Sequence, residues 1–280
     1  MDIGFRFEHI GYWSEVKLDI VRKYAEAYSR ILAAQTKPRL CHVYIDGFSG
    51  PGVHISRTSG EFVPGSPLNA LLVQPPFCEY YFVDLDGDKA DHLRREIGER
   101  KNVWVIHGDC NQVLPKQVFI KARYGDYRRA LCLLDPYGLH LDWSVIETAG
   151  KMGSIDLFLN FPVMDINRNA LWRDPRAVTD EQAARMTIFW GDNSWRTDAY
   201  RPSRQMGLFG DNVEKVENAD IAEAFRARLK SAAGFQYVPR PMPMRNKRGT
   251  VVYYLCFASQ KAVAQDIVED IFAAYRKRGA

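Results

Sequence analysis

The segment from residue 42 to residue 52, His-Val-Tyr-Ile-Asp-Gly-Phe-Ser-Gly-Pro-Gly, constrains the fold more than any other part of the chain. Its apolar half is rich in β-branched and aromatic residues, which is typical of a strand buried on both faces. The strand is predicted to end at Asp46. Gly47, Gly50 and Gly52 then allow positive φ and a close approach of the backbone to a ligand. Ligands of open α/β sheets bind beyond the carboxyl ends of parallel strands, so a binding site is expected here.

The glycine spacing disfavours a nucleotide-binding oxidoreductase. The dinucleotide fingerprint reads Gly-x-Gly-x-x-Gly, opens a helix directly and has an acid about 20 residues later. Here the order is Gly-x-x-Gly-x-Gly, and the next strand-ending acid, Asp84, lies much further along the chain. A polar loop is expected over residues 53–63. After it, Ser66 is predicted to cap a helix that has Pro67 at its first position.

Acidic residues recur at the ends of successive predicted strands. Asp46 and Asp84 end the first two strands, and Asp109 comes just after the third. An acid before the glycine loop and another at the next strand tip suit a ligand with an amino-acid end and a nucleoside end, such as S-adenosylmethionine. Asp109 could accept a hydrogen bond from adenine while the backbone N–H of Cys110 reaches a ring nitrogen. Gly-Asp pairs also turn strands for structural reasons alone.

The fourth strand, residues 129–134, is followed by Asp135-Pro136-Tyr137-Gly138. Proline fixes φ and removes a donor, so the Asp135 carboxylate and the Pro136 carbonyl oxygen can both accept from one NH₂ group. Tyr137 can stack on a planar base at the same time. The alternative is a simple turn in which Asp135 caps the following segment.

Bulk properties predict one α/β domain over residues 1–280. There is no apolar run near 18 residues and no signal-peptide pattern at the N-terminus, so a cytoplasmic location without membrane contact is expected. Five cysteines without a Cys-x-x-Cys pair predict reduced thiols and no metal site. The net charge of +4 is a weak signal. Basic clusters at 240–248 and 276–278 indicate either nucleic-acid contact or simple solvation.

The remaining elements follow from periodicity. An amphipathic helix capped by Ser14 could turn Lys17 and Tyr24 toward the cofactor, or leave them as a solvated lysine and a core tyrosine. A segment rich in tryptophan and arginine, residues 164–212, is predicted to be an insertion that binds substrate or a partner protein. The other expected elements are helices near 66–73, 89–100, 219–232 and after 259, and strands at 155–161, 236–244 and 250–258.

This layout of βα units, a helix and a closing antiparallel hairpin resembles the class I methyltransferase fold, a Rossmann-like, mostly parallel seven-stranded sheet. More narrowly, the chain resembles the three-Cys-motif partner protein family. The motifs that carry this resemblance are Trp13-Ser14-Glu15-x-Lys17-Leu18 with Tyr24, Asp46-Gly47-Phe48-Ser49-Gly50-Pro51-Gly52, Gly65-Ser66-Pro67, Phe82-Val83-Asp84, Asp135-Pro136-Tyr137-Gly138 and Tyr253-Tyr254-Leu255. The resemblance implies a methyltransferase architecture and a companion protein that bears a three-cysteine motif.

The resemblance also implies roles for individual residues. Asp135-Pro136-Tyr137 is similar to the Asp-Pro-Pro-Tyr element of enzymes that methylate nucleic-acid amines, but lacks the second proline. The cofactor-binding residues would be Asp46, Gly47, Gly50 and Gly52 at the methionine end with Phe48 packed against it, Asp84 at the ribose, Asp109 and Cys110 at the adenine, and additionally Lys17 and Asp86.

Two functions are therefore expected as alternatives. The first is an S-adenosylmethionine-dependent methyltransferase acting on an exocyclic amine of a nucleic-acid base. The second is an S-adenosylmethionine-binding but catalytically weak protein that acts only in complex with a three-cysteine-motif companion.

Overall fold

The computed structural model describes residues 7–172, 174–202 and 213–277. Its centre is a seven-stranded sheet with the order β11-β12-β8-β7-β2-β5-β6. Six strands run in one direction, and only β12, which lies between β8 and β11 and forms a hairpin with β11, runs antiparallel to them. This is the Rossmann-like class I methyltransferase fold that the sequence predicts. The strands are β2 (Cys41–Asp46), β5 (Glu79–Asp84), β6 (Val103–His107), β7 (Arg128–Leu134), β8 (Ile155–Phe161), β11 (Met242–Arg245) and β12 (Val251–Ala258).

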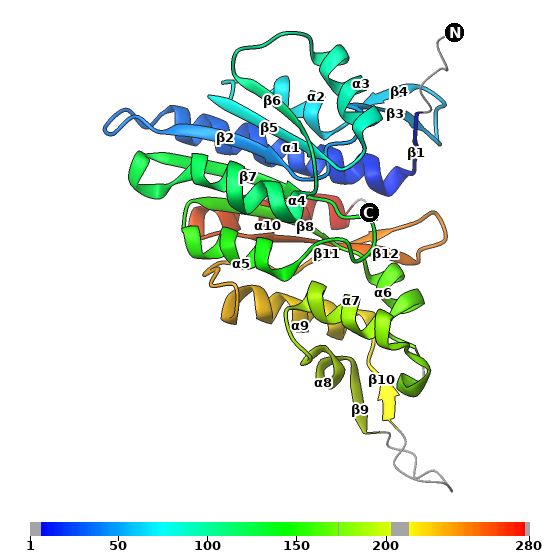
Figure 1. Cartoon of the computed structure of the whole chain (residues 1–280). Helices are drawn as coiled ribbons and strands as arrows, with labels where there is room; N and C mark the ends of the chain where they lie inside the picture. Colours follow the sequence, from blue (N-terminus) through cyan, green and yellow to red (C-terminus); the bar gives the residue numbers. More distant parts are fainter. Residues whose placement is uncertain (1–6, 173, 203–212, 278–280) are drawn as a thin grey trace, which may run out of the picture.

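Helices cover both faces of the sheet (Figure 1). Successive side chains of a strand point to opposite faces, so Tyr44 packs toward the first group of helices, and Val43 and Ile45 toward the second. The first group is α1 (Tyr12–Ala33), α2 (Ser66–Leu71), α3 (Gly87–Ile97) and α10 (Ala262–Lys277). The second group is α4 (Cys110–Val113), α5 (Trp143–Met152), α7 (Asp180–Trp190), α8 (Trp195–Ala199) and α9 (Asn218–Ser231).

The region predicted as a polar loop, residues 53–63, instead contains two strands, β3 (Val53–Ser56) and β4 (Phe62–Pro64). They pair with each other, and β3 also pairs in parallel with β1 (His9–Ile10). This pairing brings together segments that are distant in sequence, so the local pattern did not indicate it. The small sheet covers one side of the strand ends.

Two predicted helix caps are also wrong. The N-cap of α1 is Gly11, and the helix begins before Ser14. The N-cap of α2 is Gly65, so Ser66 is already the first helical residue. Gly65 donates its N–H to the Gly52 carbonyl oxygen at 2.7 Å. The glycine loop and the start of α2 are therefore joined directly, and this close contact places the cap one residue earlier than propensity suggested.

The predicted insertion is more regular than its broken periodicity indicated. It contains most of α6 (Val163–Asn169), all of α7 and α8, and β9 (Tyr200–Pro202), which pairs with β10 (Val213–Lys215) just beyond the insertion. Residues 173 and 203–212, including Arg204, lie outside the described residues. Trp190 and Trp195 are fully buried, and the centres of the Trp190 and Phe225 rings are 5.5 Å apart. These two tryptophans are core residues and are not available for stacking on a base.

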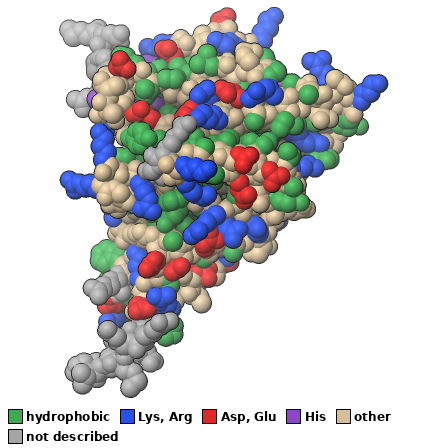
Figure 2. Space-filling view, turned by 180° about the vertical axis from the view of Figure 1, so that it is seen from behind, with side chains coloured by type: hydrophobic (Ala, Val, Ile, Leu, Met, Phe, Trp, Pro, Cys, Tyr) green, Lys and Arg blue, Asp and Glu red, His purple; other side chains and the backbone are tan. Residues whose placement is uncertain are grey.

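Basic and acidic side chains are interspersed on the face seen from behind (Figure 2), so this face does not present a surface of one charge. Among the described residues, no helix combines the length and the apolar character needed to cross a membrane.

Candidate functional site

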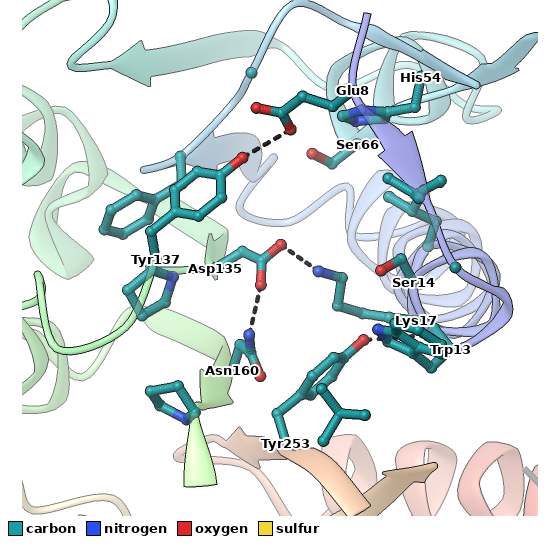
Figure 3. Close-up of a pocket in the computed structure, with 18 of the residues that line it drawn as sticks. Glu8, Trp13, Ser14, Lys17, His54, Ser66, Asp135, Tyr137, Asn160 and Tyr253 are labelled. Atoms are coloured by element: carbon teal, nitrogen blue, oxygen red, sulfur yellow. Dashed lines mark hydrogen bonds and ion pairs between the residues drawn. The ribbon is translucent and has the colours of Figure 1, made fainter. Parts of the chain in front are cut away.

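A cleft with a volume of about 360 Å³ lies at the carboxyl ends of the parallel strands. The size falls within the range of small-molecule sites. Residues of three different layers turn toward its centre (Figure 3). The central strands and the loops that follow them contribute Phe48, Ser49, Gly50, Asp84, Asp135, Pro136, Tyr137, Asn160 and Tyr253. The surrounding segments contribute Glu8, Trp13, Ser14, Lys17, His54, Arg57, Ser66 and Asp165, among others.

Asp135, at the end of β7, is fixed by two neighbours. Its Oδ2 forms an ion pair with the Lys17 ammonium group, and its Oδ1 accepts a hydrogen bond from Asn160 Nδ2 at 2.9 Å. The Lys17 side chain is only 7% exposed and also lies 5.4 Å from the centre of the Tyr253 ring. Lys17 therefore faces the cleft, as one of the two sequence interpretations expected, and the carboxylate it meets is that of Asp135.

The glycine loop is anchored to the neighbouring strand by Asp84. Its Oδ2 accepts from Gly50 N at 2.7 Å, and its Oδ1 accepts from Asp86 N at 2.9 Å. Gly50 and Gly52 have positive φ, as predicted. A Cβ on Gly52 would lie 2.6 Å from Leu93 Cδ1, so packing also requires a glycine there. Only Gly50 of the three loop glycines lines the cleft.

Gly47 differs from the other two loop glycines because its φ is not positive. A Cβ at this position would lie 2.7 Å from Leu134 Cδ2, so close packing against β7 explains the residue. Gly47 thus brings the loop close to the strand that carries Asp135.

Asp46 is completely buried beneath the loop and does not line the cleft. Its Oδ1 accepts from Phe48 N at 3.1 Å, and its Oδ2 is buried without a geometrically satisfactory hydrogen bond in the described part of the chain. Burial raises the pKa of Asp46 to about 7, although the Ser66 hydroxyl and the Phe48 N–H act in the opposite direction. The structure thus places Asp46 as a support of the loop.

Two acids and one cysteine that were expected to bind the cofactor, Asp86, Asp109 and Cys110, do not line the cleft. Asp86 caps α3 by accepting from Asp88 N and Lys89 N, and Asp109 caps α4 by accepting from Asn111 N at 2.9 Å. Cys110 is buried, and burial raises its pKa to about 12. The assignment of Asp109 and Cys110 to adenine, and of Asp86 to the cofactor, stays a prediction.

Tyr137 forms one wall of the cleft. Its hydroxyl donates to Glu8 Oε2 at 2.7 Å, and Glu8 Oε1 pairs with Lys89 Nζ at 2.6 Å. Lys89 Nζ also lies 5.1 Å from the centre of the Tyr137 ring. Burial, followed by the contact with Glu8, raises the pKa of Tyr137. The Tyr137 ring is therefore held in place by Glu8, which directly precedes β1, and by Lys89 of α3.

Sequence reasoning assigned no role to two polar residues of the cleft. Asn160 Oδ1 and His54 Nδ1 are both buried and lack a hydrogen-bond partner among the described residues. Burial lowers the pKa of His54. The signal for Asn160 was available, because an amide interrupts an otherwise apolar strand. His54 gave no signal, because β3 was not predicted.

No protein-family model and no curated protein sequence matches the chain. Solved structures with a similar fold include a candidate S-adenosylmethionine-dependent methyltransferase from Listeria monocytogenes (12% identity, 85% of this chain and 98% of that chain, TM-score 0.41). A candidate methyltransferase from Thermobifida fusca is 15% identical over 87% of this chain and 81% of that chain, with a TM-score of 0.42. A third is a candidate methyltransferase in complex with the Haloferax volcanii Trm112 activator (10% identity, 89% and 94%, TM-score 0.36). The resemblance to the three-Cys-motif partner family stays a prediction.

Proposed function

We propose that this protein is an S-adenosylmethionine-dependent methyltransferase whose acceptor is an exocyclic amine of a nucleic-acid base. The observation that carries the proposal is the position of Asp135. It stands at the tip of β7 in the same cleft as Gly50 and Asp84, which belong to the loop and strand end where this fold binds its ligand.

The charges of the cleft suit a cationic cofactor. Four carboxylates line it, those of Glu8, Asp84, Asp135 and Asp165, against the cations of Lys17 and Arg57. The aromatic rings of Trp13, Phe48 and Tyr253 also line the cleft, and aromatic faces attract cations. The buried acceptor Asn160 Oδ1 is free to receive a hydrogen bond from an ammonium or amine group.

The chain's own contribution to transfer is positioning. S-adenosylmethionine, when bound, supplies an activated methyl group on its sulfonium. An ionised carboxylate has about four acceptor sites, so Asp135 can accept from an amine while it keeps Lys17 and Asn160. Asp135 and the Pro136 carbonyl oxygen would then direct the nitrogen lone pair at the methyl group. Holding two reactants in line supplies several kcal/mol of the barrier.

Tyr137 suits a planar acceptor. Its side chain lines the cleft and the residue is 61% exposed, so a base can lie against the ring. Contacts with Glu8 and Lys89 fix the ring in advance, which lowers the entropy cost of stacking. A base in duplex DNA or RNA would first have to flip out, at a cost of a few kcal/mol.

The experiment that tests this function has two parts. Calorimetric titration with S-adenosylmethionine and NAD should show binding of the first only; the reverse result would overturn the proposal. Labelled S-adenosylmethionine is then incubated with the chain and separate DNA, RNA and protein fractions. We expect label in a nucleic-acid fraction, and label confined to protein would refute the proposed acceptor.

A second candidate function is that of a methyltransferase that works only with a companion protein. The insertion and the strand that follows it expose apolar side chains: Trp172 is 41% exposed, Ile188 53% and, in β10, Val213 43%. Such residues are enriched in protein interfaces. A three-cysteine-motif companion is the partner that the sequence resemblance implies. Co-expression should then yield a stable complex with higher transfer activity than the chain alone, and Ile188→Glu should weaken it.

A further inference from the structure

A second cavity, with a volume of about 340 Å³, lies at the opposite end of the sheet from the cleft. It is formed by the last turns of α1, the amino ends of β7 and β8, and the start of α10. Most of its wall is apolar. The apolar residues are Ile31, Leu32, Leu40, Val263, Ala264 and Ile267, joined by the rings of Tyr24, Tyr28 and Tyr124.

The acid at the base of this cavity already has its hydrogen-bond partners. Asp156 is half-buried and accepts from Tyr24 Oη at 2.7 Å and from Ser259 Oγ at 2.5 Å. Two hydroxyl donors on one carboxyl group satisfy it without a cation. Asp156 therefore supports the floor of the cavity, and it forms no direct ion pair with the cations at the rim.

The rim carries two cations that stand on one aromatic ring. The Arg129 guanidinium lies 3.5 Å from the centre of the Tyr124 ring, and Lys261 Nζ lies 5.9 Å from it. Arg129 donates to the carbonyl oxygens of Tyr124 and Arg128. Among the described residues, neither Arg129 nor Lys261 has an acidic oxygen within the ion-pair distance of 4.0 Å. Asp156 also lines the cavity and its charge acts on Lys261, but only from beyond ion-pair distance, so an anionic group at the rim can still pair directly with both cations.

We infer that this cavity binds a small organic acid with a flat apolar body, whose carboxylate meets Arg129 and Lys261. The tyrosine rings and aliphatic side chains would cover the body, because flat rings pack well on one another and on methyl groups. A few polar groups at the end of an apolar cavity are the usual design of small-molecule sites. A guanidinium provides the paired donors that a carboxylate prefers.

This site is separate from the cleft. Lys17 and Tyr24 both project from α1, one into each cavity, and seven residues of helix correspond to about 10 Å of rise. The two cavities have no lining residue in common. The inference does not depend on the proposed function, so an inactive enzyme would leave it standing.

The test uses the full chain and two probes of nearly equal shape, 2-naphthoate and the uncharged 2-naphthalenemethanol. Isothermal titration calorimetry measures both with the wild type and with Arg129→Gln/Lys261→Gln. We expect the wild type to bind the acid at least tenfold more tightly than the alcohol. The double variant should lose this preference while its affinity for the alcohol is unchanged.

Two further variants place the binding in this cavity. Val263 is 53% exposed at the cavity, so Val263→Trp should fill it without disturbing the core and should abolish binding of both probes. Lys101→Gln, which removes an exposed cation that lines neither cavity, should change nothing. Equal affinity for acid and alcohol, or naphthoate binding that survives Val263→Trp in a variant with wild-type circular dichroism, would overturn the inference.

Discussion

The two cavities hold their central carboxyl groups in opposite ways. In the cleft, Asp135 is paired with a cation and an amide, from Lys17 and Asn160. In the second cavity, Asp156 receives only two hydroxyl hydrogen bonds, from Tyr24 and Ser259. A nearby cation favours the charged carboxylate, whereas desolvation by burial favours the protonated acid, and at Asp156 this desolvation outweighs the opposing hydrogen bonds from the two hydroxyl groups. The comparison teaches that the same side chain serves as a charged, positioned group at one end of the sheet and as a structural group at the other.

The largest expected effect is on catalysis at the cleft. Asp135→Ala removes the group that would orient the acceptor amine, so we expect transfer to fall by at least a hundredfold while the affinity for S-adenosylmethionine stays within a factor of about three. Filter assays of labelled methyl transfer and calorimetry measure the two quantities. Asp126→Ala, at an exposed aspartate just before β7, is the matched control. Unchanged turnover in Asp135→Ala would remove its assignment.

The next largest effect is a loss of stability when the cation paired with Asp135 is removed. Lys17→Met leaves Asp135 mostly buried without its cation, and we expect a loss of about 2 kcal/mol in the free energy of unfolding, reduced from the value of a fully buried pair because Asp135 is 29% exposed. Lys17→Met/Asp135→Asn should recover most of this loss. Urea denaturation measures all three proteins. If Lys17→Met were as stable as the wild type, the ion pair between Lys17 and Asp135 would not contribute to the stability of the folded protein.

At the second cavity, the contribution of Asp156 to stability should depend on pH. Burial raises the pKa of Asp156 to about 6, above its ordinary value of 3.8, while hydrogen bonds from Ser259 and Tyr24 and the charge of Lys261 lower it. Since the folded protein holds this proton more tightly, the contribution of Asp156 to stability is full below pH 3.8 and is lost as the pH rises through about 6. Asp156→Asn should therefore gain about 1–2 kcal/mol relative to the wild type between pH 4 and pH 7. A gain that does not depend on pH would contradict the shift.

The smallest effect tests a single hydroxyl group. Tyr24→Phe removes one of the two donors to Asp156 and should lower the free energy of unfolding by about 1 kcal/mol at pH 7. Because Tyr24 lies outside the cleft, we expect S-adenosylmethionine to bind as it does to the wild type. Tyr28→Phe, on the same helix but without a hydrogen bond to Asp156, is the control for loss of a tyrosine hydroxyl. A change in cofactor affinity in Tyr24→Phe alone would show that the two cavities are coupled.

The fold was largely predictable because its signals are local. Buried parallel strands are apolar runs, and the glycines and acids at their ends stand next to them in sequence, as in residues 42–52 and at Asp135. The cleft was predictable only in part. Glu8 and His54 reach it through the pairing of β1 with β3, which sequence-local patterns do not reveal, whereas Asn160 lies in a strand that was predicted but was assigned no role. Asp86 and Asp109 resemble ligand residues locally but serve as helix caps.

Helix α1 contributes a side chain to each cavity, Lys17 at one end and Tyr24 two turns later. Two binding sites that share one helix are subject to thermodynamic reciprocity. If a ligand in the second cavity shifts or rotates α1 and so changes the affinity of the cleft for the cofactor by some factor, the cofactor must change the affinity of the second cavity for that ligand by the same factor. Coupling through α1 could then be measured at either cavity, by titrating one ligand in the presence and absence of the other.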